Sequence, residues 1–226
     1  MPLPPPTFAS KYLFASFTSS CLIMTAERHP LRPFLPDGAG TLVLGSFPPP
    51  RARWSMDFFY PNFTNDFWRI MGLIHYGDPG RFVDAAARRF RQGDIEAFCT
   101  ARGLALYDTA TVVCRLRGNA SDDHLQILEP TDVRALLDRL PRCRQVATTG
   151  GKASQQLMAT LGLARVPAVG QALDLCLRGD GTASEAAGDA AGGRPLRWWR
   201  MPSTSRAYPL SLERKAEAYR RLFEGA

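Results

Sequence analysis

Several features of metal-binding and nucleotide-binding proteins are missing from this sequence. Only five of its 226 residues are cysteines, and they are scattered, with no CxxC and no paired Cys/His spacing. This argues against a zinc site and against an iron–sulfur cluster. The odd number and the lack of a disulfide framework are typical of a protein in a reducing cytoplasm. The five are Cys21, Cys99, Cys114, Cys143 and Cys176.

Nucleotide-binding loops and membrane spans are missing as well. There is no G-x-G-x-x-G, and TGGKA at 149–153 departs from a P-loop because Val146 stands at the first glycine position and Ala153 follows the lysine. No apolar run approaches the ~20 residues that cross a membrane. Residues 1–28 make a poor signal peptide, and we expect a flexible tail there, or a true start at Met24.

Lysine is rare, whereas arginine is abundant. Of 28 basic residues only three are lysines, and the net charge is +7. Residues 171–196 carry four acidic and two basic side chains, so the rest of the chain has a net charge of +9. A basic chain of this kind is attracted to polyphosphate, and arginine forms bidentate phosphate contacts. A GC-rich genome would produce the same arginine bias, so the charge only supports a nucleic-acid partner.

The most informative stretch of the chain is Thr41 to Trp68. Its apolar run Leu42 to Leu44 ends at Gly45, as a buried parallel strand does. A loop rich in proline and aromatic residues follows, and a helix begins at Thr64 or Asn65. Ligands of open α/β sheets bind outside the carboxyl ends of the strands, so this loop is expected to form the wall of a site for a flat ligand.

The rest of the pattern predicts one α/β domain. Three further strands are expected at 104–107, 145–148 and 197–201, alternating with helices that include 82–91 and 212–223. We therefore predict a three-layer α/β/α domain over 29–226, with a central four-stranded, mostly parallel sheet. The Gly, Ala, Asp and Ser content of 178–194 predicts a disordered insertion.

Five motifs, in order, resemble the uracil-DNA glycosylase superfamily. They are GSFPP at 45–49 with the FFY cluster at 58–60, then N-D-F-W at 65–68, GLALYD at 103–108, TGGKA at 149–153 and MPSTS at 201–205. The first two are most similar to the hypoxanthine (deoxyinosine) DNA glycosylase branch. The resemblance covers roughly His29 to Phe223 and implies that superfamily's fold. It also implies base excision from DNA, in which a base leaves the stack and enters a pocket.

The resemblance implies that Asn65 is the catalytic asparagine. An amide is a weak base, but it can orient water and favour a developing positive charge on the sugar. The residue types alone allow another interpretation, because Asn before an amphipathic helix is also a normal N-cap. One side chain can serve both purposes.

The same resemblance predicts the base-binding residues. Phe58, Phe59 and Tyr60 correspond to the stacking loop, with Phe59 favoured, although at least one of the three is expected in the core. Phe47 stands where sister branches carry a water-activating Asp or Asn; phenylalanine cannot activate water, so it is expected to pack against the base or line the pocket. Asp108 takes the place of a base-reading asparagine, or else caps the next turn.

The remaining motifs predict contacts to DNA phosphates. Ser203, Thr204 and Ser205, together with Ser46, suit the phosphates around an extruded nucleotide, and Lys152 and Arg206 add charge. Arg206 or Tyr208 is expected to fill the gap left by the base. Met201 replaces the histidine that stabilises the leaving base in some branches, and the three histidines of this chain are expected elsewhere.

Three functions stay open on these grounds. The leading one is a monomeric, monofunctional glycosylase that hydrolyses uracil or hypoxanthine from DNA without metal, iron–sulfur cluster or other cofactor, and without a membrane partner. The second is a non-catalytic nucleic-acid-binding protein on the same fold, whose site Phe47 and Met201 have altered. The third is an enzyme acting on a free nucleotide or metabolite, which the missing nucleotide motifs disfavour.

Overall fold

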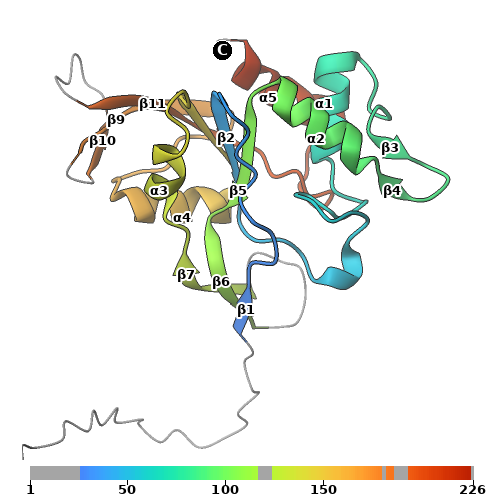
Figure 1. The fold of residues 1–226 in the computed structure, drawn as a ribbon, viewed down its shortest axis with the longest axis horizontal. Helices are drawn as coiled ribbons and strands as arrows, with labels where there is room; N and C mark the ends of the chain where they lie inside the picture. The colour runs from blue at the N-terminus through green and yellow to red at the C-terminus, as the bar shows by residue number, and fades with distance from the viewer. Residues whose placement is uncertain (1–25, 117–123, 180–181, 186–192, 225–226) are drawn as a thin grey trace, which may run out of the picture.

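The computed structural model describes residues 26–116, 124–179, 182–185 and 193–224. Figure 1 shows the arrangement of the helices and strands along the chain. The helices are η1 (Arg51–Arg53), α1 (Phe67–Tyr76), α2 (Gln92–Ala101), α3 (Val133–Asp138), α4 (Gly151–Leu161) and α5 (Leu212–Phe223). The strands are β1 (Ala26–Arg28), β2 (Thr41–Gly45), β3 (Val83–Asp84), β4 (Arg89–Phe90), β5 (Leu104–Asp108), β6 (Ala110–Arg115), β7 (Leu125–Pro130), β8 (Gln145–Thr149), β9 (Gln171–Leu177), β10 (Ala183–Glu185) and β11 (Arg194–Met201).

The central sheet has six strands in the order β10-β9-β11-β8-β2-β5. Its four predicted strands, β11, β8, β2 and β5, are neighbours and run parallel. The prediction of four strands is wrong in number, because β9 pairs antiparallel with β11 and β10 antiparallel with β9. In β9 the alternate residues Leu173, Leu175 and Leu177 are buried, a period-2 pattern that the polar composition of the surrounding segment obscured.

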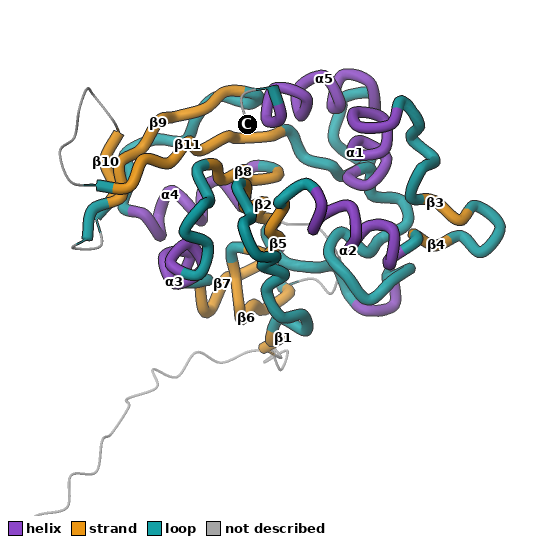
Figure 2. The backbone as a smooth tube through the Cα atoms, turned by 45° about the horizontal axis from the view of Figure 1, so that its top comes forward, coloured by secondary structure: helices purple, strands orange, loops and turns teal. Residues whose placement is uncertain are grey.

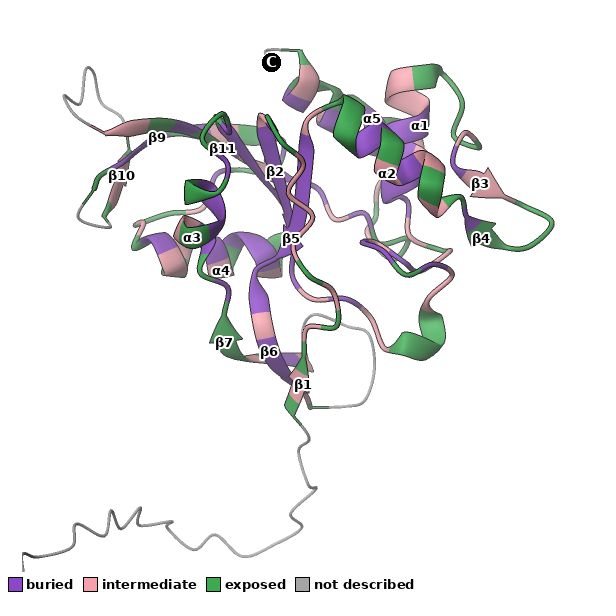
Figure 3. Cartoon of the chain, viewed as in Figure 1, coloured by how far each residue is buried: buried purple, intermediate pink, exposed green. Residues whose placement is uncertain are grey.

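Helices cover both faces of this sheet, which gives a mixed α/β fold. In Figures 1 and 2, α1, α2 and α5 lie on one side, and α3 and α4 lie on the other. Helices α1 and α5 pack directly against each other, and Phe67 of α1 contacts Tyr219 of α5. The buried residues follow the sheet and the helix faces turned to it (Figure 3), so the core holds the strand ends in place.

A second, three-stranded antiparallel sheet has the order β1-β6-β7 and was not predicted. Residues 1–25 of the predicted tail lie outside the described residues, but Ala26–Arg28 form β1 and pair with β6, so the tail does not extend to residue 28. Within the predicted insertion at 178–194, residues 180–181 and 186–192 also lie outside the described residues. Ala183–Glu185 form β10 there, where disorder was expected.

The segment around 82–91 is a short β-hairpin, although a helix was predicted there. Phe82 and Phe90 are buried at its two ends, and the Asp84 carboxylate accepts a hydrogen bond from the Ala87 N–H at 3.1 Å across the turn. Arg88 adopts a positive φ of 50°, which a helix does not allow. This turn chemistry outweighed the helical propensity of the alanines.

In the part of the chain that the structure describes, no helix combines the length and the apolar character that crossing a membrane requires. Among the same residues, no group of three or more His, Cys, Asp or Glu side chains could hold a metal ion.

Candidate active site

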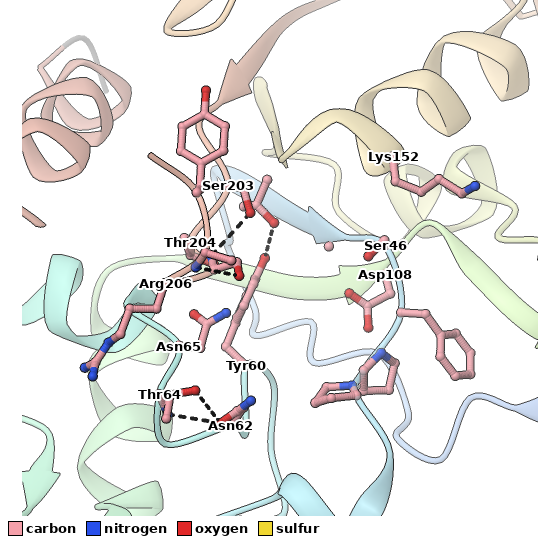
Figure 4. A pocket seen from close by; sticks show the side chains of 18 of the residues that line it. Ser46, Tyr60, Asn62, Thr64, Asn65, Asp108, Lys152, Ser203, Thr204 and Arg206 are labelled. Atoms are coloured by element: carbon pink, nitrogen blue, oxygen red, sulfur yellow. Dashed lines mark hydrogen bonds between the residues drawn. The ribbon is translucent and has the colours of Figure 1, made fainter. Parts of the chain in front are cut away.

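A cavity of about 980 Å³ opens where all four parallel strands end. Gly45, Asp108 and Thr149 are the last residues of β2, β5 and β8, and Ser203 follows the end of β11. All four line the cavity, and Figure 4 shows how side chains from these strand ends face one another. The sheet topology therefore places this cavity at the strand ends, where a ligand site was expected.

Asn65 lines this cavity just before α1. Its side-chain oxygen accepts a hydrogen bond from the Phe67 N–H at 2.8 Å, so Asn65 does satisfy a free amide at the helix start. The helix itself begins at Phe67, two residues later than the latest start predicted. Because the oxygen is held by this bond, the orientation of the amide toward the cavity is fixed (Figure 4).

Tyr60 forms the aromatic wall next to Asn65 (Figure 4). Its ring stacks on Phe67 with centroids 3.9 Å apart, and its hydroxyl and Thr149 Oγ1 are 3.0 Å apart and share a hydrogen bond. Its backbone has a φ of 52°, a conformation that non-glycine residues rarely adopt. Strained backbone of this kind is concentrated at functional sites, and here stacking and hydrogen bonding hold it in place.

The other aromatic residues divide between the cavity and the core. Phe47 and Phe59 line the cavity, although Phe59 is almost completely buried. Phe58 does not line it: the ring is buried in the core and contacts Phe34 and Trp68. Phe58 is therefore misplaced among the predicted base-binding residues, whereas the expectation that one member of the cluster is core agrees with this arrangement.

Asp108 lines the cavity, and its side chain is 10% exposed. His29 binds the Asp108 carboxylate but does not line the cavity. His29 Nε2 lies 2.9 Å from Asp108 Oδ2, and the histidine side chain is only 2% exposed. Thr131 Oγ1 donates to the Asp108 backbone oxygen at 2.7 Å. Burial first, and the negative charge of Asp108 second, raise the pKa of neighbouring Tyr107.

His29 was missed in the sequence, where the histidines were expected away from the site. It lies 79 residues from Asp108, and Phe34 places its segment beside β5 through a pair of backbone hydrogen bonds with Leu106. A contact between residues so far apart in the sequence leaves no local pattern that could predict it. The only signal is a histidine shortly before the first strand of the motif series.

The loop after β11 closes the opposite side of the cavity with Ser203, Thr204, Ser205 and Arg206. Gly150 packs beside Ser203 with a φ of +92°, a backbone conformation that favours glycine. Tyr208 also lines the cavity. Met201 is fully buried at the end of β11, so no side chain from that position reaches the cavity.

A buried ion pair joins this loop to the start of α1. Lys215 Nζ of α5 lies 2.8 Å from Asp66 Oδ2 and donates to the Ser205 backbone oxygen at 2.8 Å. Arg206 lies 3.6 Å from the other oxygen of Asp66. Asp66 in turn donates its backbone N–H to the Thr204 oxygen at 2.9 Å. The neighbour of Asn65 is therefore fixed to the serine-rich loop.

Lys152 and Ser46 complete the lining, each beside a strand end. Lys152 is in the first turn of α4, whose amino end carries a partial positive charge, so this wall of the cavity favours an anion. Of the predicted site residues, the structure brings together all except Phe58: Asn65, Phe47, Phe59, Tyr60, Asp108, Ser46, Lys152, Ser203, Thr204, Ser205 and Arg206.

Comparisons with known proteins support the fold. No family model matches the sequence. No curated protein matches it either. The fold is similar to the solution NMR structure of a protein from Methanosarcina acetivorans, described as a "putative Uracil DNA glycosylase". The TM-score is 0.50 and the identity 19%, and the similarity covers 88% of this chain and 99% of that chain.

Proposed function

We propose that this protein is a DNA glycosylase that hydrolyses the N-glycosidic bond of a deaminated base, uracil or hypoxanthine, after the nucleotide has left the duplex. The observation that carries the proposal is the cavity itself: Asn65, Tyr60 and Asp108 line it together with a serine-rich loop. The cavity combines an aromatic wall on which a base can stack, a carboxylate that can accept from the base edge, and hydroxyl groups that can donate to phosphate. Recognition of an extruded base requires these three elements. The similarity in fold to a protein described as a "putative Uracil DNA glycosylase" supports it.

In this mechanism the extruded base lies against the aromatic wall of Tyr60 and Phe59, and its ring N–H donates to Asp108. The bond from the Phe67 N–H holds the Asn65 carboxamide toward the sugar, where it orients the attacking water. Carbon–nitrogen bond cleavage leaves positive charge on the sugar, and the base departs as an anion. The oriented water then adds to the sugar and gives up a proton, which the base anion accepts.

Monofunctional hydrolysis is proposed because the two described lysines have other environments. Lys215 is bound to Asp66 and Ser205 in the core, and Lys152 lies at the helix end that suits a phosphate. Borohydride should therefore trap no covalent enzyme–DNA adduct. A trapped adduct would assign a lyase reaction instead.

The test is base release from a labelled duplex that contains a single dU or dI, followed by alkaline cleavage of the abasic site. We expect a strand break at the modified position and none in matched duplexes with dT or dA. Absence of a break on every modified substrate at high enzyme concentration would contradict the proposal. Salt-dependent DNA binding without base release would favour the non-catalytic alternative, and indifference to DNA would favour a small-molecule substrate.

A further inference from the structure

We propose that His29 is a positioning residue that sets the substrate class of this cavity to bases with a ring N–H. It does so by binding one oxygen of Asp108 and leaving the other as a permanent acceptor. This inference rests on the proposed function, since it concerns the base edge that Asp108 reads. It assigns a role to a histidine that does not line the cavity.

The geometry leaves one hydrogen bond between His29 and Asp108. His29 Nε2 is 2.9 Å from Asp108 Oδ2, and Nδ1 lies close to both polar groups of the Leu31 backbone, 3.2 Å from N and 2.9 Å from O. A neutral ring can accept from the Leu31 N–H, and a charged ring can donate to the Leu31 oxygen. In both states Nε2–H donates to Oδ2.

The remaining tautomer leads to the same result at the second oxygen. If the ring nitrogen Nε2 accepts instead, the shared proton is on Oδ2, and Oδ1 is then a carbonyl oxygen. In all three arrangements the proton lies between His29 and Oδ2, so Oδ1 of Asp108 accepts hydrogen bonds and never donates. The specificity therefore does not depend on which of the two residues carries the proton.

Oδ1 of Asp108 is held beside Gly45, which lines the cavity. A Cβ on Gly45 would lie 2.2 Å from Asp108 Oδ1, so only glycine allows the carboxylate this place. Thr131 holds the backbone of Asp108, and the rings of Tyr107 and Phe47 enclose His29 at centroid distances of 4.7 and 5.3 Å. In Figure 4 the carboxylate of Asp108 is directed to the side of the cavity where Tyr60 and Asn65 lie.

A fixed acceptor selects among the bases by their ring nitrogens. Uracil presents N3–H and hypoxanthine presents N1–H, and each can donate to Oδ1. Cytosine N3 and adenine N1 carry lone pairs instead. With either base, the ring nitrogen and Asp108 Oδ1 are both acceptors and neither has a donor, which is unfavourable in a site that contains little water. The Oδ1 contact should therefore favour the deaminated bases over their amino parents, cytosine and adenine.

The experiment is a double-mutant cycle on His29 and Asp108. His29→Phe keeps an aromatic ring but removes the donor, and it should lower single-turnover release of uracil or hypoxanthine roughly 10- to 100-fold. His29→Gln supplies an amide N–H and should recover much of this loss. In an Asp108→Asn background the amide presents its own acceptor, so His29→Phe should have little additional effect.

Binding separates this inference from the proposed function. Duplexes with 2′-fluoro-dU or 2′-fluoro-dC, which resist hydrolysis, report base preference without turnover. We expect wild-type protein to prefer the uracil duplex. The His29→Phe variant, once circular dichroism has shown that it is folded, should lose most of that preference. An unchanged preference in His29→Phe, equal losses in both Asp108 backgrounds, or no preference in the wild type would overturn the inference. Wild-type protein that shows the preference but releases no base would contradict only the glycosylase function.

Discussion

At the scale of single residues, Asn65 combines two tasks that a substitution can separate. Its oxygen accepts from the Phe67 N–H at 2.8 Å, and the residue lines the cavity. Asn65→Ala should lose most base release while DNA binding is kept, and the lost cap should lower the free energy of unfolding by ~1 kcal/mol. Single-turnover kinetics and urea denaturation measure the two effects.

Asn65→Ser is the matched control, because a serine hydroxyl can accept from the Phe67 N–H but offers no carboxamide. It should be close to wild type in stability and as inactive as Asn65→Ala. Full activity in either variant would mean that Asn65 is a cap and nothing more.

At the scale of elements, the Lys215–Asp66 pair joins α5 to the start of α1. The two side chains are 1% and 9% exposed, so removing one charge leaves the other buried. Lys215→Met should lower the free energy of unfolding by ~3–5 kcal/mol, less where Arg206 compensates Asp66. Arg220→Ala breaks an exposed pair with Glu217 on the same helix and should cost less than about 1 kcal/mol.

Denaturant titration of these variants and of Asp66→Asn/Lys215→Met tests this. The double variant removes both charges and should recover part of the loss. If Lys215→Met and Arg220→Ala lowered the free energy of unfolding equally, the buried pair would contribute no more stability than an exposed pair.

The packing of α1, α2 and α5 also predicts a pH dependence through His75. Burial, followed by the charge of Arg102, lowers the pKa of His75 to about 4 from 6.5. The ring packs between Phe98 of α2 and Phe223 of α5. Between those two pH values the unfolded chain binds a proton that the folded chain does not. Stability should therefore fall as the pH drops from 6.5, with the loss complete below about 4.

The size of this effect should be on the order of 1–2 kcal/mol, after allowance for the partial exposure of the ring. His75→Phe keeps the aromatic packing and removes the titration, so its stability should change less over the same range. Urea midpoints at pH 6.5, 5.5 and 4.5 measure the difference. Parallel curves for the two proteins would rule out His75 as the cause.

The sequence predicted those elements whose signal is local. The apolar runs of β2, β5, β8 and β11 and the amphipathic pattern of α5 each occupy one continuous stretch, and all are present. A cavity at the strand ends also lies where a ligand site was expected. Strand β1 is only three residues long and exists through its partner β6, so no periodicity could reveal it.

The site residues that escaped prediction did so for the same reason. His29 reaches Asp108, and Lys215 reaches Asp66, across 79 and 149 positions of the chain. Such contacts depend on how the sheet orders its strands. Phe58 was misassigned because adjacent residues of one loop, Phe58 and Phe59, point into different surroundings, which sequence letters do not distinguish.

At the scale of the whole molecule, the net charge of +7 predicts salt-dependent DNA binding. Each phosphate contact that releases a counterion adds about 0.9 to the slope of log K against log salt. Lys152→Ala should weaken binding to all sequences alike and lower that slope by about 1. Fluorescence anisotropy at several salt concentrations measures it.

Arg139→Ala is the matched control for this prediction. Arg139 is the C-cap residue of α3 and precedes β8, so it lies near the amino ends of the parallel strands, opposite the end where the cavity opens. Its removal lowers the total charge equally but should leave the slope nearly unchanged. If both variants lower the slope equally, the attraction comes from overall charge and not from the cavity wall.

The four strand ends that meet at the cavity have one more consequence. Gly45, Asp108, Thr149 and Ser203 come from positions 45 to 203 of the chain, so the complete lining of the cavity forms only when all four strand ends have come together. Catalytic competence is thus a property of the completed tertiary structure, and proteolytic pieces should be inert even where they keep helical content. Base release measured during refolding should therefore appear only after β11 has paired with β8, and its time course would report that step.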